Sequence, residues 1–125
     1  MLSEEEIVEL CAKAQHEVAH IYGYATGSPT PSALDLTWGE MEEDLQGVAR
    51  ALVEHILKGE RDPARLQAFW VGQMLSIGWI WGPHLLRKEH PWLVSFEDLP
   101  PYQRVRMELV ISVTLGVASR YGLLV

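Results

Sequence analysis

The chain has 125 residues, of which 48% are hydrophobic and 22% are charged, and its formal net charge is −7. This composition is typical of one globular domain and excludes a disordered chain. The negative charge argues against nonspecific binding of nucleic acid. The single cysteine excludes an internal disulfide framework and any cysteine-rich zinc site.

The charge is unevenly distributed between the two halves of the chain. Residues 1–60 carry 12 acids and 3 bases, a net charge of −9, whereas residues 61–125 carry 5 acids and 7 bases, a net charge of +2. An anionic partner would therefore meet the second half more readily.

The first residues and the longest apolar run indicate whether a signal peptide or a membrane-spanning segment is to be expected. The first ten residues, MLSEEEIVEL, are acidic and lack the basic region of a signal peptide. The longest apolar run, around residues 109–118, is too short to span a bilayer. We therefore expect a cytoplasmic protein, or one in the host cytoplasm if it comes from a phage, with no membrane insertion and no nucleic-acid partner.

Helical periodicity and capping signals predict a first helix from Glu4 to Tyr24. Ser3 and Glu6 form a capping box at its start. Its apolar positions at helical spacing are Ile7, Leu10, Cys11, Ala14, Val18, Ile21 and Tyr22. The following stretch GSPTPS, residues 27–32, is expected to break the chain.

Three further helices are predicted by the same signals. One begins near Trp38 behind a capping box of Thr37 and Glu40, and it ends at the stretch KGERD. The next is capped by Asp62 and ends at Gly78. The last runs from the Pro100–Pro101 pair to about Tyr121. It is apolar nearly all round, so we expect it at the centre of the core or at a subunit interface.

Residues 79–101 are predicted to form a long aromatic loop between the third and fourth helices. Two short strands, Trp79–Trp81 and Trp92–Val94, would make a small β hairpin in it. The predicted fold is therefore mainly α, with four helices and this loop, in a single domain that spans residues 1–125.

Residues 16–20 read HEVAH, the H-E-x-x-H pattern that places two zinc-binding histidines one helical turn apart. Glu40 could supply the third ligand, so a small zinc metallopeptidase with His16, His20 and Glu40 as metal ligands is the alternative function. Too few residues precede His16 for a substrate-binding strand, and a helical wheel places both histidines opposite the apolar stripe. We therefore favour a solvated or hydrogen-bonded histidine pair without metal.

The segment GWIWGPHLLRKEHPWLVSFEDLP, residues 78–100, resembles the signature segment of the ryanodine-receptor domain family. The matching residues are Gly78, Trp79, Trp81, Gly82, Pro83, Lys88, His90, Pro91, Leu93, Val94, Phe96, Asp98, Leu99 and Pro100. The first helix is similar too, with His16, Glu17 and Tyr22 in place and His20 where the family usually has an arginine. The resemblance covers about residues 10–115.

This resemblance implies a mainly helical, non-enzymatic module without a cofactor. In calcium-release channels such domains are structural and regulatory, and single-domain forms occur in bacteria and their phages. Because the channel repeats pack in pairs, the resemblance also implies that a lone domain could form a homodimer through its apolar last helix.

The aromatic loop offers side chains that suit an anionic ligand. Aromatic faces beside cationic groups can stack a base and hold a phosphate. The candidate ligand-binding residues are Tyr22, Trp79, Trp81, Gly82, His84, Arg87, Lys88, His90 and Trp92. Three interpretations remain open: a pocket for a small anionic or nucleotide-like ligand, a surface for a protein partner, and a scaffold in which the tryptophans anchor the loop.

Overall fold

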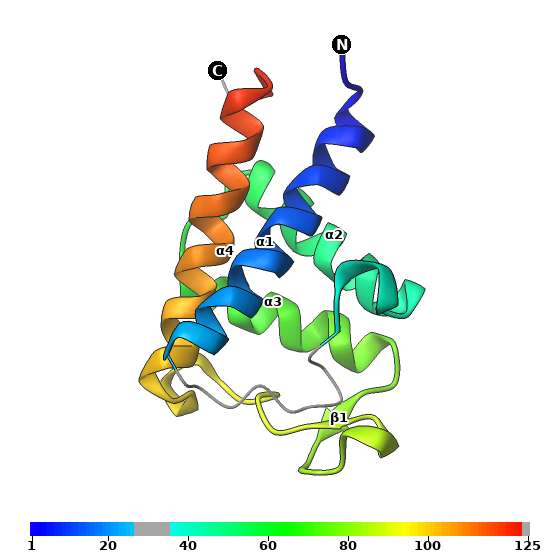
Figure 1. Ribbon diagram of the computed structural model, residues 1–125. Helices are drawn as coiled ribbons and strands as arrows, with labels where there is room; N and C mark the ends of the chain where they lie inside the picture. The colour runs from blue at the N-terminus through cyan, green and yellow to red at the C-terminus, as the bar shows by residue number, and fades with distance from the viewer. Residues whose placement is uncertain (27–35, 124–125) are drawn as a thin grey trace.

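The computed structural model describes residues 1–26 and 36–123. Its helices are α1 (Glu4–Thr26), α2 (Glu43–Leu57), α3 (Pro63–Ser76) and α4 (Pro101–Arg120), and its strands are β1 (Ile80–Trp81) and β2 (Glu89–His90) (Figure 1). The prediction of a mainly α fold with four helices and a loop between α3 and α4 is confirmed. The predicted chain break at residues 27–32 lies outside the described residues.

Local capping chemistry explains where the helices begin. Ser3 and Glu6 exchange hydrogen bonds between side chain and backbone at the start of α1. Thr37 and Glu40 form a second capping box, but it begins a short 3-10 turn, Trp38–Glu40, and α2 starts only at Glu43. Asp62 caps α3 by accepting a hydrogen bond from the backbone N–H of Ala64.

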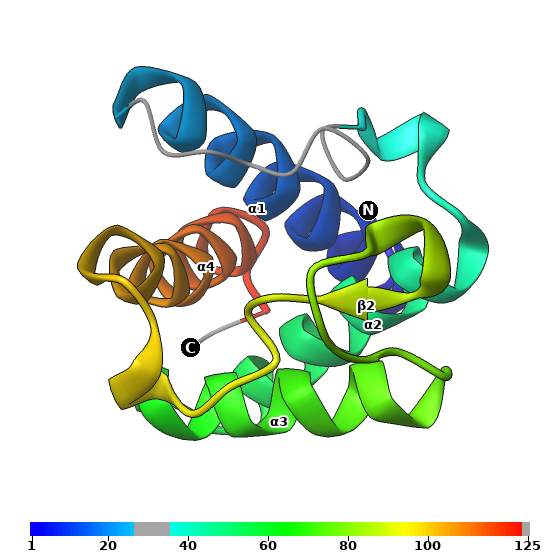
Figure 2. The same ribbon diagram turned by 90° about the horizontal axis from the view of Figure 1, so that it is seen from below.

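The helices surround a common interior. In Figure 1, α1 and α4 lie side by side and run in opposite directions. Figure 2 shows α1 and α3 on opposite sides of the molecule, with α4 and the β2 segment between them. This arrangement brings residues from all four helices and from the aromatic loop around one central space.

Apolar packing occupies the ends of this interior in three clusters. One joins α1, α2 and the end of α4 around Val53, and a second joins α2, α3 and α4 around Leu66. The third fastens the loop to α2 and α3 through Trp79 and Leu93. Truncating a fully buried leucine such as Leu66 to alanine typically costs about 2–5 kcal/mol.

The buried face of α1 differs from the predicted apolar stripe. The residues that α1 buries are Ile7, Cys11, Ala12, Gln15, Ala19 and Gly23. The predicted stripe is confirmed at Ile7 and Cys11 but is wrong at Leu10 and Ile21, which are exposed at 37% and 64%. Two alanines, one glutamine and one glycine occupy the rest of the interior face.

The strands in the loop also differ from the prediction. β1 and β2 pair in parallel, with Ile80 opposite Glu89 and Trp81 opposite His90, so they do not form a hairpin. Residues 92–94 are not a strand. Parallel strands cannot be joined by a two-residue hairpin turn. Here the connection between β1 and β2 contains a 3-10 turn at Leu85–Arg87.

Within the described residues, none of the helices combines the length and the apolar character needed to cross a membrane.

Candidate functional site

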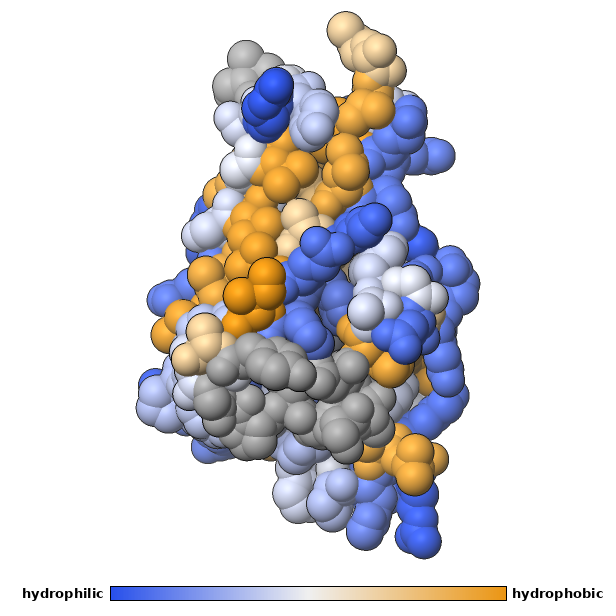
Figure 3. All heavy atoms as spheres, viewed as in Figure 1, coloured by the Kyte–Doolittle hydropathy of each residue, from blue (hydrophilic) through white to orange (hydrophobic). Residues whose placement is uncertain are grey.

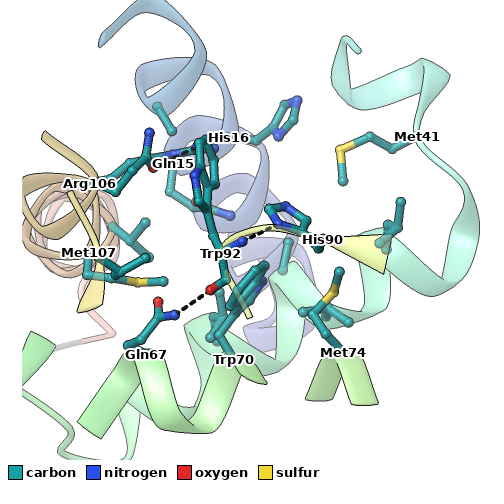
Figure 4. Close-up of a pocket in the computed structure, with 18 of the residues that line it drawn as sticks. Gln15, His16, Met41, Gln67, Trp70, Met74, His90, Trp92, Arg106 and Met107 are labelled. Carbon is teal, nitrogen blue, oxygen red and sulfur yellow. Dashed lines mark hydrogen bonds between the residues drawn. The ribbon is translucent and has the colours of Figure 1, made fainter. Parts of the chain in front are cut away.

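A cavity of about 160 Å³ lies at the centre of the molecule, between the four helices and the loop (Figure 4). It is lined by Gln15, His16, Ala19, Leu36, Met41, Leu45, Val48, Ala49, Leu52, Gln67, Trp70, Met74, His90, Trp92, Leu99, Gln103, Arg106, Met107 and Val110. Most of these side chains are apolar or aromatic. A few polar groups on an apolar wall are typical of a small-molecule site.

The charge of this cavity is opposite in sign to that of the chain as a whole. Among its described lining residues there is one cation, Arg106, and there is no aspartate or glutamate. No carboxylate in the described part of the chain forms an ion pair with this guanidinium. Arg50, by contrast, pairs with Glu9 and Glu43 at 2.6 and 3.0 Å.

The protein compensates the Arg106 charge only in part. The guanidinium carbon lies 5.2 Å from the centre of the Trp92 ring, and Nη1 donates a 3.3 Å hydrogen bond to Oε1 of Gln103. Part of the residue remains in contact with solvent, yet burial of the charged group lowers the pKa of Arg106. A cation–π contact contributes about 1–2 kcal/mol, whereas the transfer of an ion from water into a protein costs several kcal/mol. The contacts of Arg106 therefore offset only part of the cost of its charge.

Three buried glutamines add further polar groups to the cavity wall. Gln67 is only 1% exposed and donates two 3.0 Å hydrogen bonds, to the backbone oxygens of Trp92 and Val94. Gln103 accepts from Arg106. Gln15 is 7% exposed, and within the described residues no hydrogen bond to its amide is found. Buried amides normally have partners, so the amide of Gln15 in particular suits a polar occupant of the cavity.

His90 places an uncharged imidazole with one N–H donor on the wall of the same cavity. The backbone N–H of Trp92 donates to its Nδ1 at 3.0 Å, so the ring proton lies on Nε2. Burial, with a smaller contribution from Arg106, lowers the pKa of His90 to about 4. At neutral pH the ring is therefore uncharged, and its Nε2–H has no hydrogen-bond partner among the described residues.

The structure brings together only two of the nine predicted ligand-binding residues. His90 and Trp92 line the cavity, and Figure 4 shows Trp92 between the Arg106 side and His90. Trp79 is buried in the core below the loop, with its ring 6.1 Å from that of His90.

The remaining predicted residues lie away from the cavity lining. Trp81 is 64% exposed. The exposed side chains also include His84, Arg87 and Lys88, while Tyr22 on α1 is half-buried. Gly82 is buried in the turn after β1, where a Cβ would lie against the side chain of Glu89.

The expected solvent-facing position of the HEVAH histidines was wrong for His16, whereas the expected hydrogen bond is present. This residue lies on the cavity wall, half-buried, with its ring 6.0 Å from that of Trp38. Its Nε2 lies 2.7 Å from the backbone oxygen of Leu36. Because a carbonyl only accepts, Nε2 carries the proton and is not free to bind a metal while this contact persists.

The other two candidate zinc ligands do not complete a cluster with His16. The carboxylate of Glu40 accepts hydrogen bonds from the backbone and the hydroxyl of Thr37. His20 is half-buried and also takes part in an interaction. Across the described ranges, no group of three or more His, Cys, Asp or Glu side chains is placed to hold a metal ion.

Sequence reasoning missed the residues that define the cavity. Arg106 reads as one more surface cation when it is considered alone. Its helix nevertheless carried a signal, because Gln103, Met107 and Val110 recur at helical spacing on the face that packs inward. An arginine in the middle of such a face is unusual enough to mark a site.

Comparison of the chain with protein-family models, with curated proteins and with solved structures found no match. The resemblance to ryanodine-receptor domains therefore stays a prediction.

Proposed function

We propose that this protein is a non-enzymatic binding module of the ryanodine-receptor-domain type, and that it holds a small organic anion in its central cavity. The observation that carries the proposal is the Arg106 guanidinium, which faces the cavity and has neither an acidic neighbour in its lining nor a carboxylate partner among the described residues. An anion would supply the missing charge, and the apolar wall would hold the body of the ligand.

The neighbouring polar groups support an anion in preference to a cation. Arg106, the Nε2–H of His90 and the amide of Gln103 all offer donors to the cavity. Each of these groups favours an acceptor such as a carboxylate or phosphate oxygen. A cationic ligand would meet the guanidinium charge and find no carboxylate among the described lining residues.

A binding role fits the cavity better than catalysis. The lining contains no nucleophilic serine, threonine or cysteine among the described residues. The lone thiol, Cys11, is buried in the α1–α2–α4 cluster, and burial raises its pKa. Its Sγ lies 3.6 Å from the backbone oxygen of Thr114, away from the cavity lining.

A thermal-shift screen tests this proposal directly. The full chain would be heated with acetate, phosphate, benzoate and AMP, because a ligand that binds the folded state raises the melting temperature. We expect at least one anion to raise it in a saturable way, and Arg106→Met to abolish the rise. Arg120→Met is the matched control, since Arg120 is exposed at the far end of the same helix.

A flat screen with all four anions would reject the cavity as an anion site. It would then favour the protein-partner interpretation. A shift with zinc alone, lost on His16→Ala, would favour the metallopeptidase alternative.

Self-association is a second element of the proposal. Large apolar side chains remain exposed on α1 and α4, among them Leu10, Ile21 and Val105, and Tyr121 is exposed directly after α4. Figure 3 shows apolar surface along α4 on the viewed face. A homodimer that covers this face is the expected form, and light scattering that gives a strictly monomeric mass would contradict it.

A further inference from the structure

We infer that the ligand of the central cavity is a monoanion of about the size of one aromatic ring, held by its carboxylate on Arg106. This inference rests on the proposed function and narrows it to one chemical class. Three independent properties of the cavity lead to it: its volume, the number of its charges and the composition of its wall.

The volume limits the ligand to about one ring. The cavity measures about 160 Å³, and an apolar protein cavity of roughly 150 Å³ holds one benzene molecule. Sites for drug-sized ligands are larger, roughly 300–1,000 Å³. A nucleotide, with a base, a sugar and a phosphate, therefore exceeds the space that this cavity provides.

The number of cationic side chains in the cavity wall favours a ligand with a single negative charge. Arg106 is the single permanent cation among the described lining residues. His90 accepts a backbone hydrogen bond at Nδ1, a contact that only the uncharged ring can make. Arg87 and Lys88, which could help to hold a phosphate dianion, are exposed and do not line the cavity.

The shape of the donor favours a carboxylate. A guanidinium presents parallel N–H groups that match the two oxygens of a carboxylate. Among the described residues, Gln103 is the one hydrogen-bond partner of Arg106 and engages Nη1, so the other N–H groups remain for the ligand. The amide of Gln15, for which the described part of the chain shows no partner, lies on the same cavity wall and offers a further donor.

The wall composition favours an aromatic body. The rings of Trp70 and Trp92 both lie near that of His90, with ring centres 5.2 and 5.3 Å from the imidazole. Met74 and Met107 add polarizable sulfur atoms to the lining. Ring faces and thioethers both make favourable contacts with an aromatic ring.

Calorimetric titration of the full chain with benzoate, benzamide and AMP tests the inference. Benzamide has the shape of benzoate without its charge, so it isolates the contribution of Arg106. We expect benzoate to bind one molecule per chain, benzamide to bind at least 10-fold more weakly, and AMP to give no binding heat. Arg106→Met is expected to weaken benzoate binding at least 10-fold, and Arg120→Met to leave it unchanged.

The outcomes separate this inference from the function on which it rests. Binding of AMP or phosphate without benzoate, lost on Arg106→Met, would overturn the one-ring carboxylate and retain an anion site. Equal binding of benzoate and benzamide by the wild-type chain would also overturn it, because the charge would then play no part. Binding of none of the anions would overturn both proposals.

Discussion

Replacement of Arg106 by methionine is expected to leave the unliganded protein at least as stable as the wild type. Methionine keeps the length of the apolar stem and removes the charge. The change gives up the stacking on Trp92, about 1 kcal/mol, and a 3.3 Å hydrogen bond to Gln103, about 1 kcal/mol. It relieves the cost of holding an ion partly out of water, which is several kcal/mol for a buried charge.

The balance predicts a gain of about 1 kcal/mol in the free energy of unfolding. In a domain of this length that gain raises the melting temperature by about 3–5 °C. Urea denaturation followed by tryptophan fluorescence measures the free energy of unfolding, and thermal denaturation measures the melting temperature. A binding residue that is costly to the unliganded fold is the expected signature of a trade-off between stability and function.

A clear loss of stability would refute this reasoning. If Arg106→Met lowered the free energy of unfolding by more than about 2 kcal/mol, the guanidinium would be a structural anchor that needs no ligand. Arg120→Met serves as the control here as well. Arg120 is exposed and its guanidinium lies 5.7 Å from the centre of the Tyr121 ring, so the change should cost no more than about 1 kcal/mol.

Three further predictions concern the loop, one helix end and the effect of pH. Gln67→Ala should cost about 2–4 kcal/mol in urea denaturation, since two loop carbonyls lose their donor; Gln73→Ala on the same helix should cost under about 0.5 kcal/mol. Gly78→Ala should destabilise the protein by about 1 kcal/mol because the φ of Gly78 is +93°. Gly72→Ala inside α3 should stabilise it by about 1 kcal/mol, so the two substitutions should shift the melting temperature in opposite directions. The pKa of His90 is about 4 when folded and about 6.5 when unfolded, so its contribution is complete above pH 6.5 and declines as the pH falls towards 4. This single group should remove about 2 kcal/mol between pH 7 and pH 5, and an NMR titration that places its pKa near 6.5 would contradict the buried neutral ring.

The helix boundaries could be predicted because they depend on local chemistry. Ser3 with Glu6, and Asp62 followed by Pro63, are capping signals that act over three or four residues, and both behave as expected in the structure. The prediction at Thr37 was accurate for the capping box and inaccurate for the helix, because the box closes a 3-10 turn before α2 begins.

The face that α1 buries could not be predicted from hydrophobicity alone. Leu10 and Ile21 are large and apolar, yet they lie outside. Ala12 is buried instead in the cluster that joins α1, α2 and α4, and Ala19 lines the central cavity. Which of two apolar stripes faces inward depends on the partner helix, and the sequence of α1 contains no information about that partner.

Only a small part of the candidate site was predicted, for a similar reason. His90 and Trp92 were named because aromatic and cationic residues cluster in one stretch of the loop. Arg106, Gln15 and Gln67 were missed because they come from three helices, and only the fold brings them to one cavity. That the Arg106 charge has no acidic neighbour in the cavity can be seen only when the fold shows which side chains surround it.

The indole N–H signals in a two-dimensional ¹⁵N–¹H NMR spectrum offer the most direct test of where an anion binds. The chain has five tryptophans, and each gives one such signal. Addition of benzoate is expected to shift the signals of Trp70 and Trp92, which line the cavity, and to leave that of the exposed Trp81 in place. A shift of Trp81 with Trp70 and Trp92 unchanged would place the anion on the outer loop and contradict the central cavity as the binding site.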